Sequence, residues 1–321
     1  MKIAYLMKDR PDYFHRLDEN SDYVIAGAEP DGTYSPETLA EVAGVDAIIV
    51  STQPVTEQLL AACPNVKIVQ RTGVGYENID LEAAARRGIP CCNIAGVNKE
   101  SVAEHGMLLI LALARKFVEA QELTRQMRWM EAKQVNQHSF ELKGKVLGVV
   151  GLGDTGSNLA KRARGFDMQI VYNDIRDIDP EIVESLGARF MEKDQLYAEA
   201  DIISVNTTHN PTTEGMVGAR ELALMKPEAI LVCCARGGII DEAALADALN
   251  GERLAGAGLD VFSAEPLSQD NPLLTAKNVY LTSHIAGVTE DAIDRSFAWA
   301  HENVRKVVDK GERPRWVVNG V

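Results

Sequence analysis

The sequence is short of disulfide-forming cysteine pairs and of positive charge, and each shortage excludes a class of protein. The five cysteines include two adjacent pairs, Cys91–Cys92 and Cys233–Cys234, and no CxxC spacing, so neither a disulfide framework nor a zinc site is expected. A formal net charge of −14 disfavours binding to a nucleic-acid backbone, which needs a basic surface. We therefore expect no metal and no nucleic-acid partner.

Long apolar runs are absent as well. The longest, Gly106–Ala114, is about half of the roughly 20 residues that a membrane-spanning helix needs. The opening MKIAYLMKDR carries Lys8 and Asp9 before a long apolar segment can develop, which argues against a signal peptide. We expect a cytoplasmic protein with no membrane partner.

What is present indicates a folded α/β protein. The chain has 321 residues, 46% of them hydrophobic and 25% charged, which suits two domains of ordinary size. Short β-rich runs alternate with helical patterns, and this alternation predicts βαβ crossovers and a mostly parallel sheet. The expected strands are 2–7, 46–50, 66–70, 145–151, 168–174, 200–206, 229–235, 254–260 and 278–284.

One long helical pattern extends from Glu100 to about Met130 and is more apolar than a surface helix requires. A helix of this kind suits an interdomain hinge and a subunit interface, and the alternative is a core helix within one domain. A last helix is expected over 290–310.

The stretch KVLGVVGLGDTGSNLA predicts a strand, a glycine turn and a helix. Gly151 allows the tight turn, Gly153 lets the backbone approach a pyrophosphate, and Gly156 permits close helix–strand packing. The next expected strand ends in Asp174, whose carboxylate can accept hydrogen bonds from the ribose hydroxyls of NAD. We predict NAD as the preferred cofactor, and the nearby Arg176 leaves use of NADP open.

Three later segments, CCARGGIIDEAAL, GAGLDVFSAEPL and LTSHIAGVTEDA, each run from a strand end into a polar loop. In a parallel α/β sheet, ligands bind at this edge. Arg236, Asp260, Glu265 and His284 are therefore candidates to converge on the nicotinamide.

At these segments the sequence resembles the D-isomer-specific 2-hydroxyacid dehydrogenases, the family of D-lactate, glyoxylate/hydroxypyruvate and 3-phosphoglycerate dehydrogenases. Six motifs occur in the family's order and cover nearly the whole chain: RTGVGYENID, VNKESVAEHG, GLGDTG, CARGGIID, GLDVFSAEP and TSHIAG.

The resemblance implies two Rossmann-like or flavodoxin-like domains, each a doubly wound parallel sheet, with the active site in the cleft between them. Residues 1–98 and 286–321 would form the substrate-binding domain, and 99–285 an inserted NAD-binding Rossmann domain. A homodimer through the 100–130 helix region is expected.

The resemblance also implies hydride transfer between NAD and a short D-2-hydroxy acid or its 2-keto acid. His284 suits the acid/base role because imidazole exchanges protons near neutral pH. Glu265 would fix the His284 tautomer and favour its charged form. Arg236 offers a fork of donors for the substrate carboxylate and the C2 oxygen. Asp260 would hold the nicotinamide carboxamide.

Two further sets of residues follow from the resemblance. Substrate is expected at the backbone N–H groups of Val74 and Gly75, and at Arg236 and His284. The cofactor is expected at Gly151, Gly153, Asp154, Thr155, Gly156, Asp174, Thr207, Cys234, Ala235, Arg236, Asp260, His284 and Gly287.

Several alternatives stay open at this point. Glu265 argues against a formate dehydrogenase, in which a glutamine takes this place. Ser51, Thr52 and Gln53 stand where many phosphoglycerate-type members carry an arginine, which disfavours a phosphorylated substrate, although Arg71 could partly compensate. Glyoxylate, hydroxypyruvate or another short 2-keto acid remain as substrates. A catalytically weak NAD(H)-sensing regulatory protein on the same fold is the alternative from another functional class.

Overall fold

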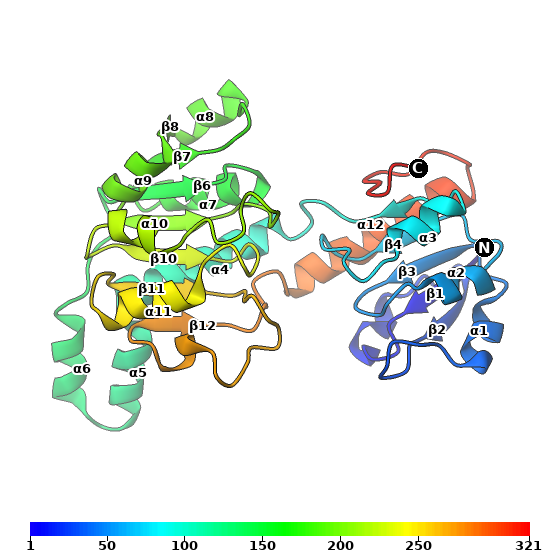
Figure 1. The fold of residues 1–321 in the computed structure, drawn as a ribbon, viewed down its shortest axis with the longest axis horizontal. Helices are drawn as coiled ribbons and strands as arrows, with labels where there is room; N and C mark the ends of the chain where they lie inside the picture. The colour runs from blue at the N-terminus through cyan, green and yellow to red at the C-terminus, as the bar shows by residue number, and fades with distance from the viewer. The chain divides into compact units, whose positions relative to one another are not determined.

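A computed structural model describes residues 1–321 (Figure 1). The chain divides into two compact units. Residues 1–97 and 289–321 form one, here named the split unit, and residues 98–288 form the other, the central unit. None of the helices combines the length and the apolar character that crossing a membrane requires.

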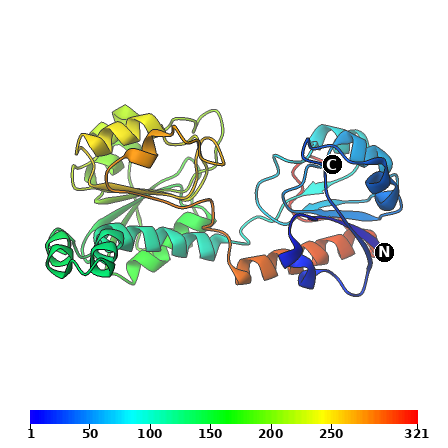
Figure 2. The same ribbon diagram turned by 90° about the horizontal axis from the view of Figure 1, so that it is seen from below.

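The split unit is built on a five-stranded parallel sheet with strand order β2-β1-β3-β4-β5. Helices α1, α2 and α3 pack on one face, while the 3₁₀ helix η1 and the returning helix α12 pack on the other. Figure 2 shows α12 lying along its face of the sheet. The bounds are β1 Lys2–Leu6, η1 Pro11–Arg16, β2 Asp22–Ala26, α1 Pro36–Val42, β3 Ala47–Val50, α2 Glu57–Ala62, β4 Val69–Arg71, α3 Leu81–Arg86, β5 Cys91–Cys92 and α12 Glu290–Val308.

The central unit carries a seven-stranded parallel sheet with order β12-β11-β10-β9-β6-β7-β8. Its strands are β6 Val146–Val150, β7 Gln169–Asn173, β8 Arg189–Phe190, β9 Ile202–Val205, β10 Ile230–Cys233, β11 Gly256–Leu259 and β12 Val279–Leu281. The helices are α4 Lys99–Ala114, α5 Phe117–Arg125, α6 Trp129–Asn136, α7 Asp154–Arg164, α8 Pro180–Leu186, α9 Lys193–Glu199, α10 Ala219–Leu224, α11 Glu242–Asn250 and the 3₁₀ helix η2 Pro272–Thr275.

Apolar side chains cover both faces of the central sheet. Leu109 of α4 and Leu159 of α7 belong to the core on one face, and Leu196 of α9 and Leu245 of α11 to the core on the other. Two doubly wound parallel sheets are what the alternating sequence pattern and the family resemblance predict, and the fold class is confirmed.

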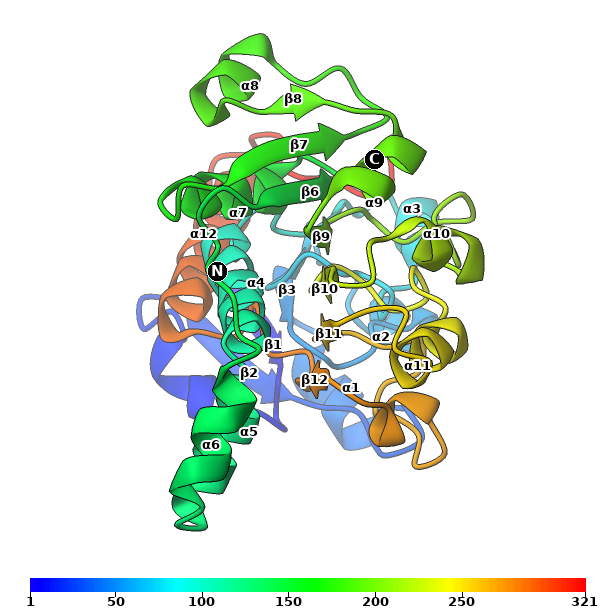
Figure 3. The same cartoon turned by 90° about the vertical axis from the view of Figure 1, so that its left-hand side faces the viewer.

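The expected single helix over 100–130 is wrong. The chain forms α4, α5 and α6 instead, because Lys116 and Met127 adopt left-handed backbone angles, with φ of 47° and 60°. A left-handed residue ends an α-helix, since it turns the chain away from the helix axis. Figure 3 shows α5 and α6 projecting from the central sheet as a hairpin.

A buried polar cluster ties α12 to its sheet. Asn303 Nδ2 donates to Gln70 Oε1 at 2.6 Å and to Arg315 O at 3.1 Å, and Asn303 Oδ1 accepts from Arg315 N at 2.8 Å. Both Asn303 and Gln70 are buried. Each of these two polar side chains can be buried without a large cost in stability only because its hydrogen-bonding groups have partners within the protein.

Replacing Asn303 by leucine should therefore destabilise the protein by about 2–3 kcal/mol, because it leaves buried polar atoms of Gln70 and Arg315 without hydrogen-bond partners. Urea denaturation followed by circular dichroism measures this change. The neighbouring substitution Glu302→Gln, on the exposed side of α12, serves as the control. A wild-type midpoint for Asn303→Leu would contradict the role of the cluster.

Candidate active site

The glycine turn joins β6 to α7 as the sequence predicts. Gly151 has a φ of +94°, which favours glycine, and its N–H donates to Asn173 O at 2.8 Å. A Cβ on Gly156 would lie 2.1 Å from Gly151 O, so only glycine fits there. The N-cap Gly153 provides no side-chain cap to α7, and the first N–H groups of this helix are left for an anion.

Asp174 follows β7, next to the glycine turn. Its Oδ2 accepts from Leu152 N at 2.9 Å, and Arg176 donates to both carboxylate oxygens. Although burial opposes ionisation, the hydrogen bonds from Arg176 and from Leu152 N hold the pKa of Asp174 below its ordinary value. The carboxylate thus stands charged beside the turn.

Thr207 follows β9, the other neighbour of β6. Its Cγ2 would lie 3.1 Å from a Cβ on Gly151, which places the side chain against the glycine turn. Its Oγ1 is buried and has no hydrogen-bond partner in the protein. A buried hydroxyl of this kind suits a hydrogen bond to a bound group, so the residues around the turn fit a dinucleotide.

Glu265 and His284 meet at the same edge of the sheet. His284 Nδ1 lies 2.7 Å from Glu265 Oε2, while Glu265 Oε1 accepts from Phe262 N at 3.0 Å. The carboxylate partner assigns the proton on Nδ1, which leaves Nε2 to exchange a proton elsewhere. Arg236 stands beyond the carboxyl end of the neighbouring β10, and its Nη1 donates to Ala235 O at 2.8 Å.

Asp260, directly after β11, holds the loop that carries His284. The buried carboxylate accepts from Thr282 Oγ1 at 2.6 Å, from Ile285 N at 2.9 Å and from Ala286 N at 2.8 Å. His284 N also donates to Asp260 O at 2.8 Å, and His284 has a φ of +56°. The observed role of Asp260 is to position this loop, and a contact with the nicotinamide carboxamide stays a prediction.

His105 of α4 extends this network, which sequence reasoning missed. Its Nε2 lies 2.9 Å from Thr282 Oγ1, the hydroxyl that donates to Asp260. His105 lies in the motif VNKESVAEHG, but the motif by itself does not indicate a contact with Thr282.

The remaining cofactor candidates lie around the same edge. Asp154 and Thr155 open α7, while Cys234 and Ala235 follow β10. Gly287 lies next to Asn98, whose Nδ2 would be 2.3 Å from a Cβ there. Burial raises the pKa of the Cys234 thiol well above its ordinary value, so this cysteine stands as a neutral side chain rather than a thiolate.

Val74 and Gly75 lie in the split unit, in the loop after β4. Val74 O accepts from Asn93 Nδ2 at 2.8 Å, which anchors the loop. A Cβ on Gly75 would lie 2.6 Å from Glu77 Oε2. The N–H groups of Val74 and Gly75 donate to no other group of the protein, and are therefore available to a bound carboxylate.

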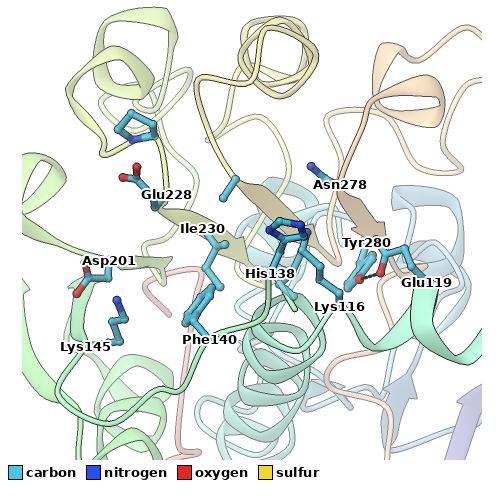
Figure 4. Close-up of a pocket in the computed structure, with 13 residues that line it drawn as sticks. Lys116, Glu119, His138, Phe140, Lys145, Asp201, Glu228, Ile230, Asn278 and Tyr280 are labelled. Atoms are coloured by element: carbon cyan, nitrogen blue, oxygen red, sulfur yellow. Dashed lines mark hydrogen bonds between the residues drawn. The ribbon is translucent and has the colours of Figure 1, made fainter. Parts of the chain in front are cut away.

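A cavity of about 390 Å³ opens at the other edge of the central sheet (Figure 4). Lys145, Asp201, Ile230, Ala255 and Asn278 line it, and each lies at or just before the amino end of a strand. The cavity is thus separated by the length of the strands from His284, and it takes no part in the chemistry considered below.

Comparison with known proteins agrees with this geometry. Residues 107–286 match the family model described as D-isomer specific 2-hydroxyacid dehydrogenase, NAD binding domain. A glyoxylate reductase of Thermococcus litoralis is 40% identical over 287 residues, which cover 88% of this chain and 86% of the relative. The holo form of D-mandelate dehydrogenase from Rhodotorula graminis superposes with a TM-score of 0.85 at 25% identity, covering 100% of this chain and 98% of that one.

A D-3-phosphoglycerate dehydrogenase of Archaeoglobus fulgidus is also 40% identical, over 81% of this chain but 49% of the relative. The chain therefore spans about half the length of that relative.

Fold, glycine turn and family match define an NAD-binding oxidoreductase. The chain belongs to the D-isomer-specific 2-hydroxyacid dehydrogenase family, and the central unit contains its NAD-binding domain. The resemblance found in the sequence is thereby confirmed.

Adding a methyl group at Gly156 should push α7 off the glycine turn. We expect Gly156→Ala to weaken NAD binding by about ten- to a hundredfold, since overpacking of this kind costs roughly 1–3 kcal/mol. Titration calorimetry with NAD measures the effect. Gly44→Ala is the matched control, because a Cβ on Gly44 meets nothing within 4 Å. Unchanged affinity in Gly156→Ala would show that the turn does not hold the cofactor.

Substituting Asp260 by asparagine should release the His284 loop, because the amide N–H₂ would face the N–H group of either Ile285 or Ala286, which donate to different oxygens of Asp260. We expect kcat for reduction of a keto acid to fall by about 100-fold, the cost of a misplaced catalytic group. Thr282→Val, which removes only one donor to Asp260, should cause a smaller fall. A kcat for Asp260→Asn within twofold of wild type would refute the positioning role.

Proposed function

We propose that the chain interconverts a short D-2-hydroxy acid and its 2-keto acid, with His284 as the acid/base. The observation that carries this proposal is the hydrogen bond between His284 Nδ1 and Glu265 Oε2, at the carboxyl edge of an NAD-binding sheet. When bound, NAD supplies the hydride acceptor at its nicotinamide ring.

His284 moves the proton. With Nδ1–H directed to Glu265, Nε2 accepts the proton of the C2 hydroxyl during oxidation and returns it to the carbonyl oxygen during reduction. Glu265 is held by Phe262 N and stabilises the imidazolium that forms. Arg236 would bind the substrate carboxylate and the C2 oxygen as a bidentate donor. That the N–H groups of Val74 and Gly75 also bind the substrate carboxylate stays a prediction from the family resemblance.

The first substrates to consider are the 2-keto acids glyoxylate and hydroxypyruvate, with their corresponding 2-hydroxy acids. The 40% identity to a glyoxylate reductase of similar length supports a small substrate. In the split unit, Gln53 Oε1 accepts from Ala28 N at 2.8 Å and Thr52 Oγ1 donates to Asp9 at 3.0 Å. Both side chains are uncharged and already hydrogen-bonded within the protein, so neither offers a positive charge to a substrate phosphate. D-3-phosphoglycerate is the second candidate, supported by the identity to phosphoglycerate dehydrogenases.

We further propose a homodimer formed through α4, α5 and α6, in the cytoplasm. Large apolar side chains gather on these helices and on the link before α6, where Met127 is 89% exposed. Large exposed apolar side chains of this kind are common at protein interfaces. The others are Leu108, Phe117, Val118, Trp129 and Met130. All five cysteines are free thiols, as suits a reducing compartment.

A screen of 2-keto acids with NADH near neutral pH tests the function. The proposal predicts NADH oxidation with at least one short keto acid. Where the corresponding hydroxy acid is chiral at C2, as it is for hydroxypyruvate but not for glyoxylate, it also predicts reduction of NAD by the D enantiomer alone. Turnover confined to the L enantiomer would contradict it. Binding of NADH with no turnover on any keto acid would favour the regulatory, NAD(H)-sensing alternative.

Replacing His284 by alanine should lower kcat by about 100- to 10,000-fold, the usual contribution of a positioned acid/base, and should change the Kd of NAD far less. Glu265→Gln should lower kcat less, because an imidazole remains in place without its carboxylate partner. His138→Ala, an exposed histidine of the same unit, controls for loss of an imidazole. Near-normal turnover by His284→Ala would exclude the assignment.

A further inference from the structure

The cavity at the amino edge of the central sheet lies outside the site described above (Figure 4). A volume of about 390 Å³ is enough for a small organic molecule. Tyr280, which lines the cavity, lies on β12 and precedes His284 by four residues, at the other end of that strand from the His284 loop. A molecule bound in this cavity would therefore be a ligand other than the substrate.

One wall of the cavity is apolar. Leu113 of α4 and Ile230 of β10 are buried, and the half-buried Phe140 packs against the same core cluster. An apolar wall of this kind favours a ligand with an apolar or aromatic body, since binding removes both surfaces from water.

Two lysines line the cavity beside this wall. Lys116 and Lys145 are half-buried, and the ammonium group of neither makes a hydrogen bond or an ion pair with another group of the chain. Lys145 Nζ lies 5.5 Å from the centre of the Phe140 ring, so this charge stands next to the apolar wall. A charge partly withdrawn from water interacts more strongly with an opposite charge than an exposed one does. An anion is therefore the ligand charge that suits this cavity.

The carboxylates that line the cavity do not supply this anion. Asp201 accepts from Lys226 Nζ at 2.8 Å, so its partner is a different lysine. Glu119 accepts from the Tyr280 hydroxyl, as Figure 4 shows. Glu228 is exposed, and water and salt screen its charge.

The backbone of Lys116 gives a second, independent indication. Lys116 has a φ of 47°, a left-handed conformation in which glycine is less strained than any other residue. The chain nevertheless carries a long cationic side chain at this position, and that side chain lines the cavity. Strained residues of this kind are found preferentially at ligand sites.

We propose that the cavity is a binding site for a small organic anion with an aromatic or other apolar body. Lys116 and Lys145 hold the anionic group, while Leu113, Phe140 and Ile230 contact the body. The site is separate from the dinucleotide site and does not depend on the function proposed above.

The test uses anilinonaphthalene sulfonate, an aromatic anion that fluoresces in apolar surroundings. It is titrated into the full chain saturated with NAD, which keeps the probe out of the dinucleotide site. Lys116→Gly and Lys145→Gln should each weaken binding of the probe by about tenfold, the equivalent of one charge-assisted contact. Phenylnaphthylamine, which has the same aromatic body without the sulfonate, should bind to these variants within twofold of wild type.

Lys193→Gln is the matched control. Lys193 is also a half-buried lysine of the central unit without a hydrogen bond or an ion pair, but it opens α9 and does not line the cavity. Its affinity for the probe should stay within twofold of wild type. Lys116→Gly should keep the circular dichroism spectrum of the wild type, because its backbone conformation suits glycine.

Three results would overturn the proposal. The first is an affinity of Lys116→Gly and Lys145→Gln for the sulfonate equal to that of Lys193→Gln. The second is equal weakening of the sulfonate and of the neutral probe, which would indicate an apolar site without charge selection. The third is a wild-type chain that binds no sulfonate, as expected if a second copy of the chain fills the cavity.

Discussion

The candidate site residues of the central unit depend on one constraint, the parallel alignment of its seven strands. Because β6, β7, β9, β10, β11 and β12 run in the same direction, their carboxyl ends share one edge. The glycine turn, Asp174, Thr207, Arg236, Asp260 and His284 all follow these ends. This edge therefore brings together residues that lie up to 133 positions apart in the sequence.

Two aspartates at this edge illustrate opposite uses of a carboxylate. Asp260 is buried, and its bonds to Thr282, Ile285 and Ala286 hold the loop in which His284 adopts a left-handed backbone. Asp174 lies under an exposed arginine that donates to both of its oxygens. Both carboxylates are buried, but the partners of Asp260 belong to the loop that it holds, whereas the main partner of Asp174 is an exposed arginine side chain.

The sequence predicts the strands that are apolar throughout and the turn that requires glycine, because those features have local causes. It missed β2, β5 and β8, which are short or partly exposed, so no apolar run marks them. It also missed the breaks at Lys116 and Met127, because neither residue type indicates a left-handed backbone. The sequence also does not predict how certain polar side chains pair. Asp260 contacts Thr282, which in turn contacts His105, and Arg176 donates to Asp174. Such contacts depend on the folded structure and follow no fixed spacing in the sequence.

The most direct test of the account follows the hydride itself. A keto acid that the enzyme turns over and whose product is chiral at C2, such as hydroxypyruvate, is reduced with NADH carrying deuterium at C4, on each face of the nicotinamide in turn. The hydroxy acid is then analysed by mass spectrometry and chiral chromatography. The account predicts that one labelled face delivers deuterium to C2 and that the product is the D enantiomer. A product without label from either face, or an L product, would contradict it.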